Sequence, residues 1–184
     1  MAMKNTKYLI VLLLLICTNG FAQKYMTKNG TIDFEASVPS FEEVKAKNNA
    51  VSAILNSETG ELASLALIQG FRFKVALMEE HFNENYMESS QYPKAIVKGK
   101  IEGLNRDELS EDITTYNFNG TITIHGVEQP LQTQVNLASN GDAIEMTTSF
   151  VLKPEDFEIE IPSIVSNKIA GEVTVSAMYT LSQR

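Results

Sequence analysis

Residues 115–152, TYNFNGTITIHGVEQPLQTQVNLASNGDAIEMTTSFVL, contain the clearest structural signal in the chain. Apolar residues recur at every second position over 116–124 and again over 131–137, with polar residues between them. This period of two is typical of antiparallel strands that bury one face and expose the other. Residues 126–130 and the pair Asn140-Gly141 predict the intervening turns, the second of them a tight hairpin. The stretch therefore predicts three consecutive antiparallel strands.

The same alternation recurs over residues 32–36, 51–55, 61–69 and 173–181, with no repeat of fixed period and no low-complexity tract. Eight or nine such runs predict an all-β fold. A sandwich and a closed barrel both fit, but strands of roughly ten residues joined by short turns favour an antiparallel up-and-down barrel of about eight strands. Such a barrel is either filled by its own side chains or holds one apolar ligand.

Two segments break the alternation and predict one or two short helices near the barrel mouth. Residues 40–43, SFEE, match a capping box and predict a helix that runs to about Lys47. In the second segment, a stripe with helical spacing predicts a helix that ends near residue 90, before Pro93. Its apolar members are Val75, Met78, Phe82 and Tyr86. This stripe either covers the mouth as a lid or completes a dry core.

Two glycines, Gly99 and Gly120, fall on the inward phase of their strands. A glycine at such a position either makes room inside the barrel or permits a bend of the strand. The sequence leaves these alternatives open.

The residues that could perform chemistry are few. His81 and Glu84 lie three apart, as in a zinc-hydrolase helix, but the position one turn from His81 is Asn85, which cannot complete that motif. The other histidine is His125, on a distant strand. We therefore expect no metal site, no cofactor and no catalytic residue. A weak hydrolase that uses His81 with a carboxylate is the least favoured alternative.

The first 22 residues have the layout of a secretory signal peptide, with Lys4 and Lys7 before an apolar run and a small-x-small site that ends at Ala22. We expect cleavage after Ala22, a single domain over 23–184, and a periplasmic or secreted protein. A retained anchor helix and lipidation at Cys17 are alternatives. Removal of the two lysines lowers the formal net charge from −8 to −10, which disfavours nucleic acid and anionic membrane surfaces. No stable membrane span is expected.

Three segments resemble the YceI-like family of bacterial polyisoprenoid-binding proteins: HFNENYMESSQYPKAIVKGKIEG (81–103), FNGTITIHGVEQPLQTQV (118–135) and SFVLKPEDFEIEIP (149–162). The resemblance spans roughly residues 25 to 182. Many members carry histidines near the first core strand, whereas residues 24–48 contain none. In this the chain resembles a branch of secreted proteins of the Bacteroidetes type. The family implies a lipocalin-like barrel with an apolar tunnel that binds an isoprenoid or similar amphiphile without catalysis.

We therefore predict a protein that binds an apolar or amphiphilic small molecule, such as an isoprenoid or another lipid, for transport, storage or a stress-related carrier role. The residues expected to line its interior combine bulk with the inward phase or the lid stripe. They are Phe71, Phe73, Phe82, Tyr86, Tyr116, Phe118, Ile122 and Phe150. Tyr86 and Tyr116 could offer a hydroxyl to a polar head group. The main alternative is a solid barrel that acts as an interaction module, and a homodimer is compatible with either.

Overall fold

The computed structural model describes residues 24–39 and 41–184, so the expected signal peptide lies outside the described residues. The strands are β1 (Lys24–Ser37), β2 (Lys45–Asn56), β3 (Glu61–Leu67), β4 (Arg72–Phe73), β5 (Lys94–Ile101), β6 (Thr114–Ile124), β7 (Val127–Asn140), β8 (Ala143–Leu152) and β9 (Ile169–Gln183). The helical elements are η2 (Ile68–Gly70), α2 (Ala76–His81), the π-helical turn η3 (Phe82–Tyr86), η4 (Arg106–Glu108) and η5 (Pro154–Phe157).

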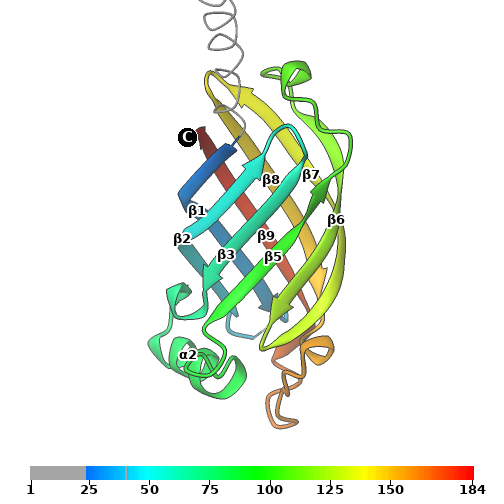
Figure 1. Ribbon diagram of the computed structural model, residues 1–184. Coiled ribbons are helices and arrows are strands. Elements are labelled where there is room, and N and C mark those ends of the chain that lie inside the picture. The colour runs from blue at the N-terminus through cyan, green and yellow to red at the C-terminus, as the bar shows by residue number, and fades with distance from the viewer. Residues whose placement is uncertain (1–23, 40) are drawn as a thin grey trace, which may run out of the picture.

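Eight of these strands form a closed barrel (Figure 1). They pair in the order β1-β9-β8-β7-β6-β5-β3-β2, each antiparallel to its neighbours, and the pairing of β1 with β2 completes the ring. The ninth strand, β4, pairs with β2 beyond the point where β3 has left it, through Ala46 opposite Phe73. The prediction of an antiparallel up-and-down barrel of about eight strands is confirmed.

The hairpins lie close to the predicted turns, with two small corrections. β7 ends at Asn140, which pairs with Ala143, so the turn predicted at Asn140-Gly141 is made by Gly141 and Asp142. The β6–β7 turn is shorter than expected, because His125 and Gly126 alone make it, with φ angles of 52° and 79°. Left-handed conformations at both central residues match the twist of a two-residue hairpin. Residues 127–130 therefore belong to β7 rather than to the turn.

The helix predicted from the capping box over residues 40–47 is wrong. Residues 45–47 begin β2 and pair with β1, with Phe34 opposite Ala46, whose side chain is buried. The Val44 amide donates to Ser37 Oγ, and the Val44 carbonyl accepts from the Ala36 amide. Closure of the barrel supplies backbone partners all along β2, and these outweigh a local capping signal.

The helix predicted after Val75 is present as α2 and η3, which lie against one end of the barrel (Figure 1). The last turn widens, because the Met87 amide donates to the Phe82 carbonyl five residues earlier. The helical geometry ends at Tyr86, a few residues before the expected limit.

The barrel interior is packed most densely at the end away from α2. Side chains there have no exposed surface, and they come from β2, β5, β7, β8 and β9. They include Leu55, Ile101, Leu137, Ile144 and Leu181. Several inward residues nearer α2, such as Phe34, Phe150 and Leu152, are only partly buried. One half of the barrel is therefore a solid core, and the other half is less completely filled.

Replacement of a leucine in the solid half should destabilise the protein far more than the same replacement on the outside. Leu137 is 0% exposed and Leu67 is 50% exposed. We expect Leu137→Ala to lower the free energy of unfolding by about 2–5 kcal/mol, because a cavity is left in a packed core. Leu67→Ala should lower it by less than about 1 kcal/mol. Urea unfolding followed by circular dichroism compares the two, and equal losses would contradict this division of the interior.

Candidate ligand-binding cavity

An internal cavity of about 560 Å³ lies at the α2 end of the barrel. Residues of seven strands form its wall: Ile32, Phe34 and Ala36 of β1, Ser64 and Ala66 of β3, Phe73 of β4, Ala95 and Val97 of β5, Ile122 and Ile124 of β6, Phe150 and Leu152 of β8, and Ile169, Val173 and Val175 of β9. Three connections cover it, namely α2 with η3, residues 153–168, and residues 41–44 between β1 and β2. A volume of this size fits a small-molecule site.

The wall is almost entirely apolar. Among the described residues that line the cavity, the side chains with polar groups are Glu42, Ser64, His81, Tyr86 and Lys168. The His81 side chain is exposed and makes no hydrogen bond or ion pair within the described part of the chain. The cavity is therefore suited to hydrophobic burial, with its few polar groups available for orientation.

Six of the eight residues expected to line the interior lie on the cavity wall: Phe71, Phe73, Phe82, Tyr86, Ile122 and Phe150. Tyr116 and Phe118 lie elsewhere. Phe118 is 2% exposed within the solid half, and Tyr116 packs against the same core. Contact with a ligand stays a prediction for the other six.

Several wall residues were not anticipated. Phe34 lies in an alternating run that indicated a strand, and its bulk on the inward phase was an available signal. Ile159, Ile161 and Val165 also line the cavity, but they belong to an irregular connection without periodicity. No sequence pattern places such residues over a barrel mouth.

Four phenylalanines fasten the helical segment to the mouth. The Phe82 ring lies 5.4 Å from Phe34, 5.9 Å from Phe71 and 5.1 Å from Phe73 between centroids, and Phe34 also contacts Phe71 and Phe73. The rings are tilted or edge-on, which are the favourable arrangements for aromatic pairs. We call α2 together with η3 the lid, since this cluster seats the segment on the barrel and forms part of the cavity wall.

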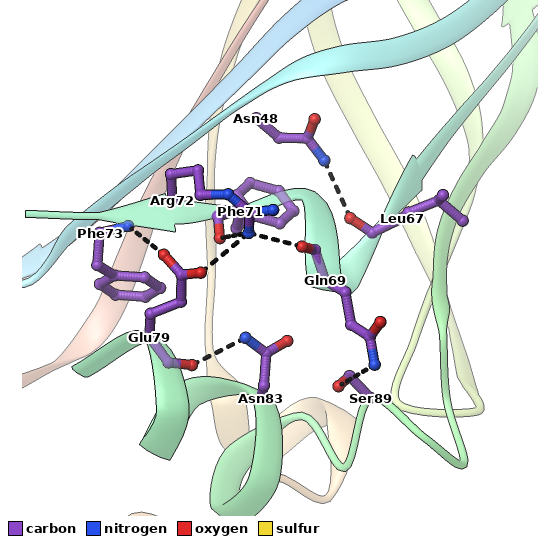
Figure 2. A network of polar contacts seen from close by, with 9 residues as sticks. All are labelled: Asn48, Leu67, Gln69, Phe71, Arg72, Phe73, Glu79, Asn83 and Ser89. Carbon is purple, nitrogen blue, oxygen red and sulfur yellow. Dashed lines mark hydrogen bonds and ion pairs between the residues drawn. The ribbon is translucent and has the colours of Figure 1, made fainter. Parts of the chain in front are cut away.

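Polar contacts hold the outer side of the lid (Figure 2). One oxygen of Glu79 accepts from Arg72 Nη1 at 2.9 Å, and the other accepts from the Phe73 amide at 3.1 Å. Arg72 Nη1 also donates to the Gln69 carbonyl, and Asn83 Nδ2 donates to the Glu79 carbonyl at 2.8 Å. Glu79 therefore ties α2 to β4 through both a side chain and a backbone amide.

Asn48 holds the corner where β3 leaves the barrel wall (Figure 2). Its Nδ2 donates to the Leu67 carbonyl at 2.9 Å, and its Oδ1 accepts from the Ala50 amide. The side chain is buried, and both polar ends are satisfied, as burial requires. A Cβ on Gly70 would lie 2.5 Å from Asn48 Nδ2, so glycine at this position lets η2 turn closely over the amide.

His125 joins three segments beside the mouth. Its Nδ1 lies 3.2 Å from the Phe157 carbonyl, and its Nε2 lies 2.9 Å from Glu88 Oε2. The Tyr92 ring packs edge-on against the imidazole at 4.4 Å. His125 is thus a structural tie, and no group of three or more potential metal ligands exists among residues 24–39 and 41–184.

Comparison with known proteins agrees with this architecture. The sequence model of the YceI-like domain matches residues 23–181. The chain belongs to the YceI-like family. No curated protein shows a significant match to it.

Solved structures similar to this YceI-like protein share its fold at low sequence identity. A polyisoprenoid-binding domain from Saccharophagus degradans, implicated in plant cell wall breakdown, has a TM-score of 0.78 and 15% identity, covering 89% of this chain and 99% of its own. BcnA of Burkholderia cenocepacia has a TM-score of 0.68 and 15% identity, covering 83% and 96%. The Campylobacter jejuni YceI protein has a TM-score of 0.59 and 14% identity, covering 78% and 88%. The likeness to a particular branch of the family stays a prediction.

The base of the cavity in the YceI-like barrel carries a buried polar pair. The hydroxyls of Ser64 on β3 and Tyr179 on β9 lie 2.8 Å apart. Burial raises the pKa of the Tyr179 hydroxyl above its ordinary value of 10.0, and the Ser64 hydrogen bond partly opposes that shift.

Within the described residues, no helix is long and apolar enough to cross a membrane.

The raised pKa of Tyr179 makes a testable contribution to stability at alkaline pH. Above about pH 10 the unfolded chain loses this proton while the folded chain keeps it, so the free energy of unfolding falls by up to about 1.4 kcal/mol per pH unit until the folded pKa is reached. Below about pH 10 this group adds no pH dependence. We expect Tyr179→Phe to show a shallower alkaline loss in urea unfolding, and an identical slope would contradict the assignment.

The contacts of Glu79 predict that it controls opening of the lid. Glu79→Ala removes an acceptor from Arg72 and from the Phe73 amide, and we expect faster hydrogen exchange, by roughly three- to tenfold, over residues 76–87. The neighbouring Glu80 is exposed, and Glu80→Ala is the matched control. The barrel strands should exchange as in the wild type in both variants. Equal effects of the two substitutions on the lid would show that helix propensity, rather than this contact, is responsible.

Proposed function

We propose that this protein binds an apolar or amphiphilic small molecule, of the isoprenoid or lipid class, inside the barrel and performs no reaction on it. The observation that carries the proposal is the apolar cavity of about 560 Å³ beneath the lid. Each buried methylene contributes about 0.8 kcal/mol, so roughly ten of them offset much of the cost of association. Such binding needs no charged contact.

The likeness to a polyisoprenoid-binding domain supports the isoprenoid class in particular. Tyr86 and Lys168, both on the cavity wall, are suited to contact a polar head group. A hollow interior speaks against the solid-barrel interaction module. His81 has no carboxylate partner within the described residues, which weakens the hydrolase alternative.

The expected signal peptide supports a location outside the cytoplasm for the carrier or storage role that we propose. The mature chain begins at Gln23 if cleavage follows Ala22, and it contains no cysteine. Mass measurement of the exported protein tests this boundary, and its oligomeric state under native conditions shows whether it forms a homodimer. An export-independent or uncleaved form would remove the basis for the location.

The binding proposal is tested by native mass spectrometry of the exported protein, purified without detergent. We expect a copurifying mass of several hundred daltons, released on denaturation and identified as a lipid. A clean apo mass with no uptake from a native lipid extract would contradict the proposal.

A pair of tryptophan substitutions tests whether the cavity is the site. Val175 lies on the cavity wall, whereas Thr174 beside it is exposed. We expect Val175→Trp to weaken lipid uptake at least tenfold by filling the cavity, and Thr174→Trp to leave it unchanged. Both variants should keep the wild-type circular dichroism spectrum. Unchanged uptake by a folded Val175→Trp variant would place the ligand elsewhere.

A further inference from the structure

The cavity occupies one half of the barrel and stops abruptly along each strand. On β5 the wall ends at Val97, and on β6 it ends at Ile122. The next inward positions are Gly99 and Gly120, which face each other across the β5–β6 ladder. Neither glycine lines the cavity, so another group occupies the space above them.

The ring of Phe118 fills that space. A Cβ built on Gly99 would lie 2.6 Å from Phe118 Cζ, and one built on Gly120 would lie 2.8 Å from it. These separations are too short for real carbon atoms, and the same Cβ atoms would also meet the Asn119 and Lys98 carbonyl oxygens of the paired strand. Glycine at both positions therefore permits the close approach of the two strands and lets the ring lie across them. The glycines that could have widened the cavity instead admit an aromatic side chain that closes it.

A second aromatic ring crosses the interior from the opposite wall. Tyr179 extends from β9, and its hydroxyl reaches Ser64 on β3, which is itself a wall residue. A Cβ on Gly30 of β1 would lie 2.5 Å from Tyr179 Cδ1, so this ring also lies directly on a glycine. Tyr179 is 4% exposed. The hydroxyl pair marks the level at which the cavity ends.

Below these two rings the interior is the solid half described above. Val135, Leu137, Ile144 and Leu181 have at most 1% of their surface exposed. Close-packed interiors of this kind do not admit an alkyl chain without displacing side chains. Phe118 and Tyr179 do not line the cavity themselves, but they lie directly below its last wall residues and separate it from this solid half. We call these two rings the floor, and a ligand can enter only from the lid side.

We propose that this floor sets the maximum chain length that the barrel can bury, and that Phe118 is the residue that determines it. At about 30 Å³ per water-sized unit, a cavity of about 560 Å³ encloses roughly twenty heavy atoms. That number corresponds to a single chain of about four isoprene units. Additional units of a longer chain protrude from the mouth into water and gain no burial. This inference rests on the proposed lipid-binding function and specifies the ligand within it.

The test uses a series of all-trans prenols with two, three, four, six and nine isoprene units. The affinity of the delipidated exported protein for each prenol is measured by displacement of a fluorescent fatty-acid probe. We expect affinity to rise at least tenfold for each unit up to about four units and then to stay level. A continued rise through six and nine units would overturn the floor while leaving lipid binding intact. If no prenol displaces the probe and the probe itself does not bind, the proposed function fails as well.

Two substitutions should move the plateau in opposite directions. Phe118→Ala removes the ring above Gly99 and Gly120, so affinity should continue to rise by about one further isoprene unit. Val97→Phe adds bulk one inward position above the floor, so the plateau should begin about one unit earlier. Leu137→Ala is the control, because it creates a void in the solid half that is not part of the floor.

The second substitution keeps the test decisive if Phe118→Ala does not fold. A folded Val97→Phe variant with the wild-type plateau would contradict the proposal, as would a plateau shifted by Leu137→Ala as far as by Phe118→Ala. Selective shifts by Phe118→Ala and Val97→Phe would support Phe118 as the determinant of chain length.

Discussion

Closure of the sheet is the constraint on which every other feature depends. Because β1 pairs with β9 along one edge and with β2 along the other, no strand of the barrel is left with an open edge, and the inward side chains of all eight strands face one another. Closure of the barrel also explains why residues 45–47 form the start of β2 despite a local helical signal. The short strand β4 also pairs with β2, and it does so where β3 has turned away from β2 at the Asn48 corner.

The interior of the closed barrel has two halves with different roles. Apolar side chains without exposed surface fill one end and supply the stability of a protein that has no disulfide within its described residues. The other end keeps its side chains apart and is covered by segments that are tied down more lightly, by the phenylalanine cluster and by the contacts of Glu79. This asymmetry suits the proposed binding role, because segments that move to admit a ligand are drawn from the parts of a fold that contribute least to its global stability.

Much of this arrangement can be predicted from local pattern. Alternation over 116–152 identifies the β6–β8 meander almost residue by residue, and the helical stripe from Val75 to Tyr86 identifies the lid. Pattern could not reveal contacts that join distant strands: Ser64 and Tyr179 are 115 residues apart, and nothing local distinguishes either of them. The pattern also could not show whether Phe118 lines the cavity or belongs to the solid half, because inward-facing residues occur in both. The inward glycines suggested room or a bend, whereas both lie against the ring of Phe118 and against the backbone of the paired strand.

The two ends of the described chain meet at the solid end of the barrel, where the Arg184 amide donates to the Lys24 carbonyl at 3.0 Å. Figure 1 shows the start of β1 and the end of β9 on the side opposite α2. A label, a fused domain or a solid support attached at either end therefore emerges on the side opposite the lid and the cavity. The same proximity suits the barrel to circular permutation, because a short linker can join the ends while new termini are placed in an exposed turn. Immobilised or fused forms of the protein should accordingly keep an unobstructed entrance.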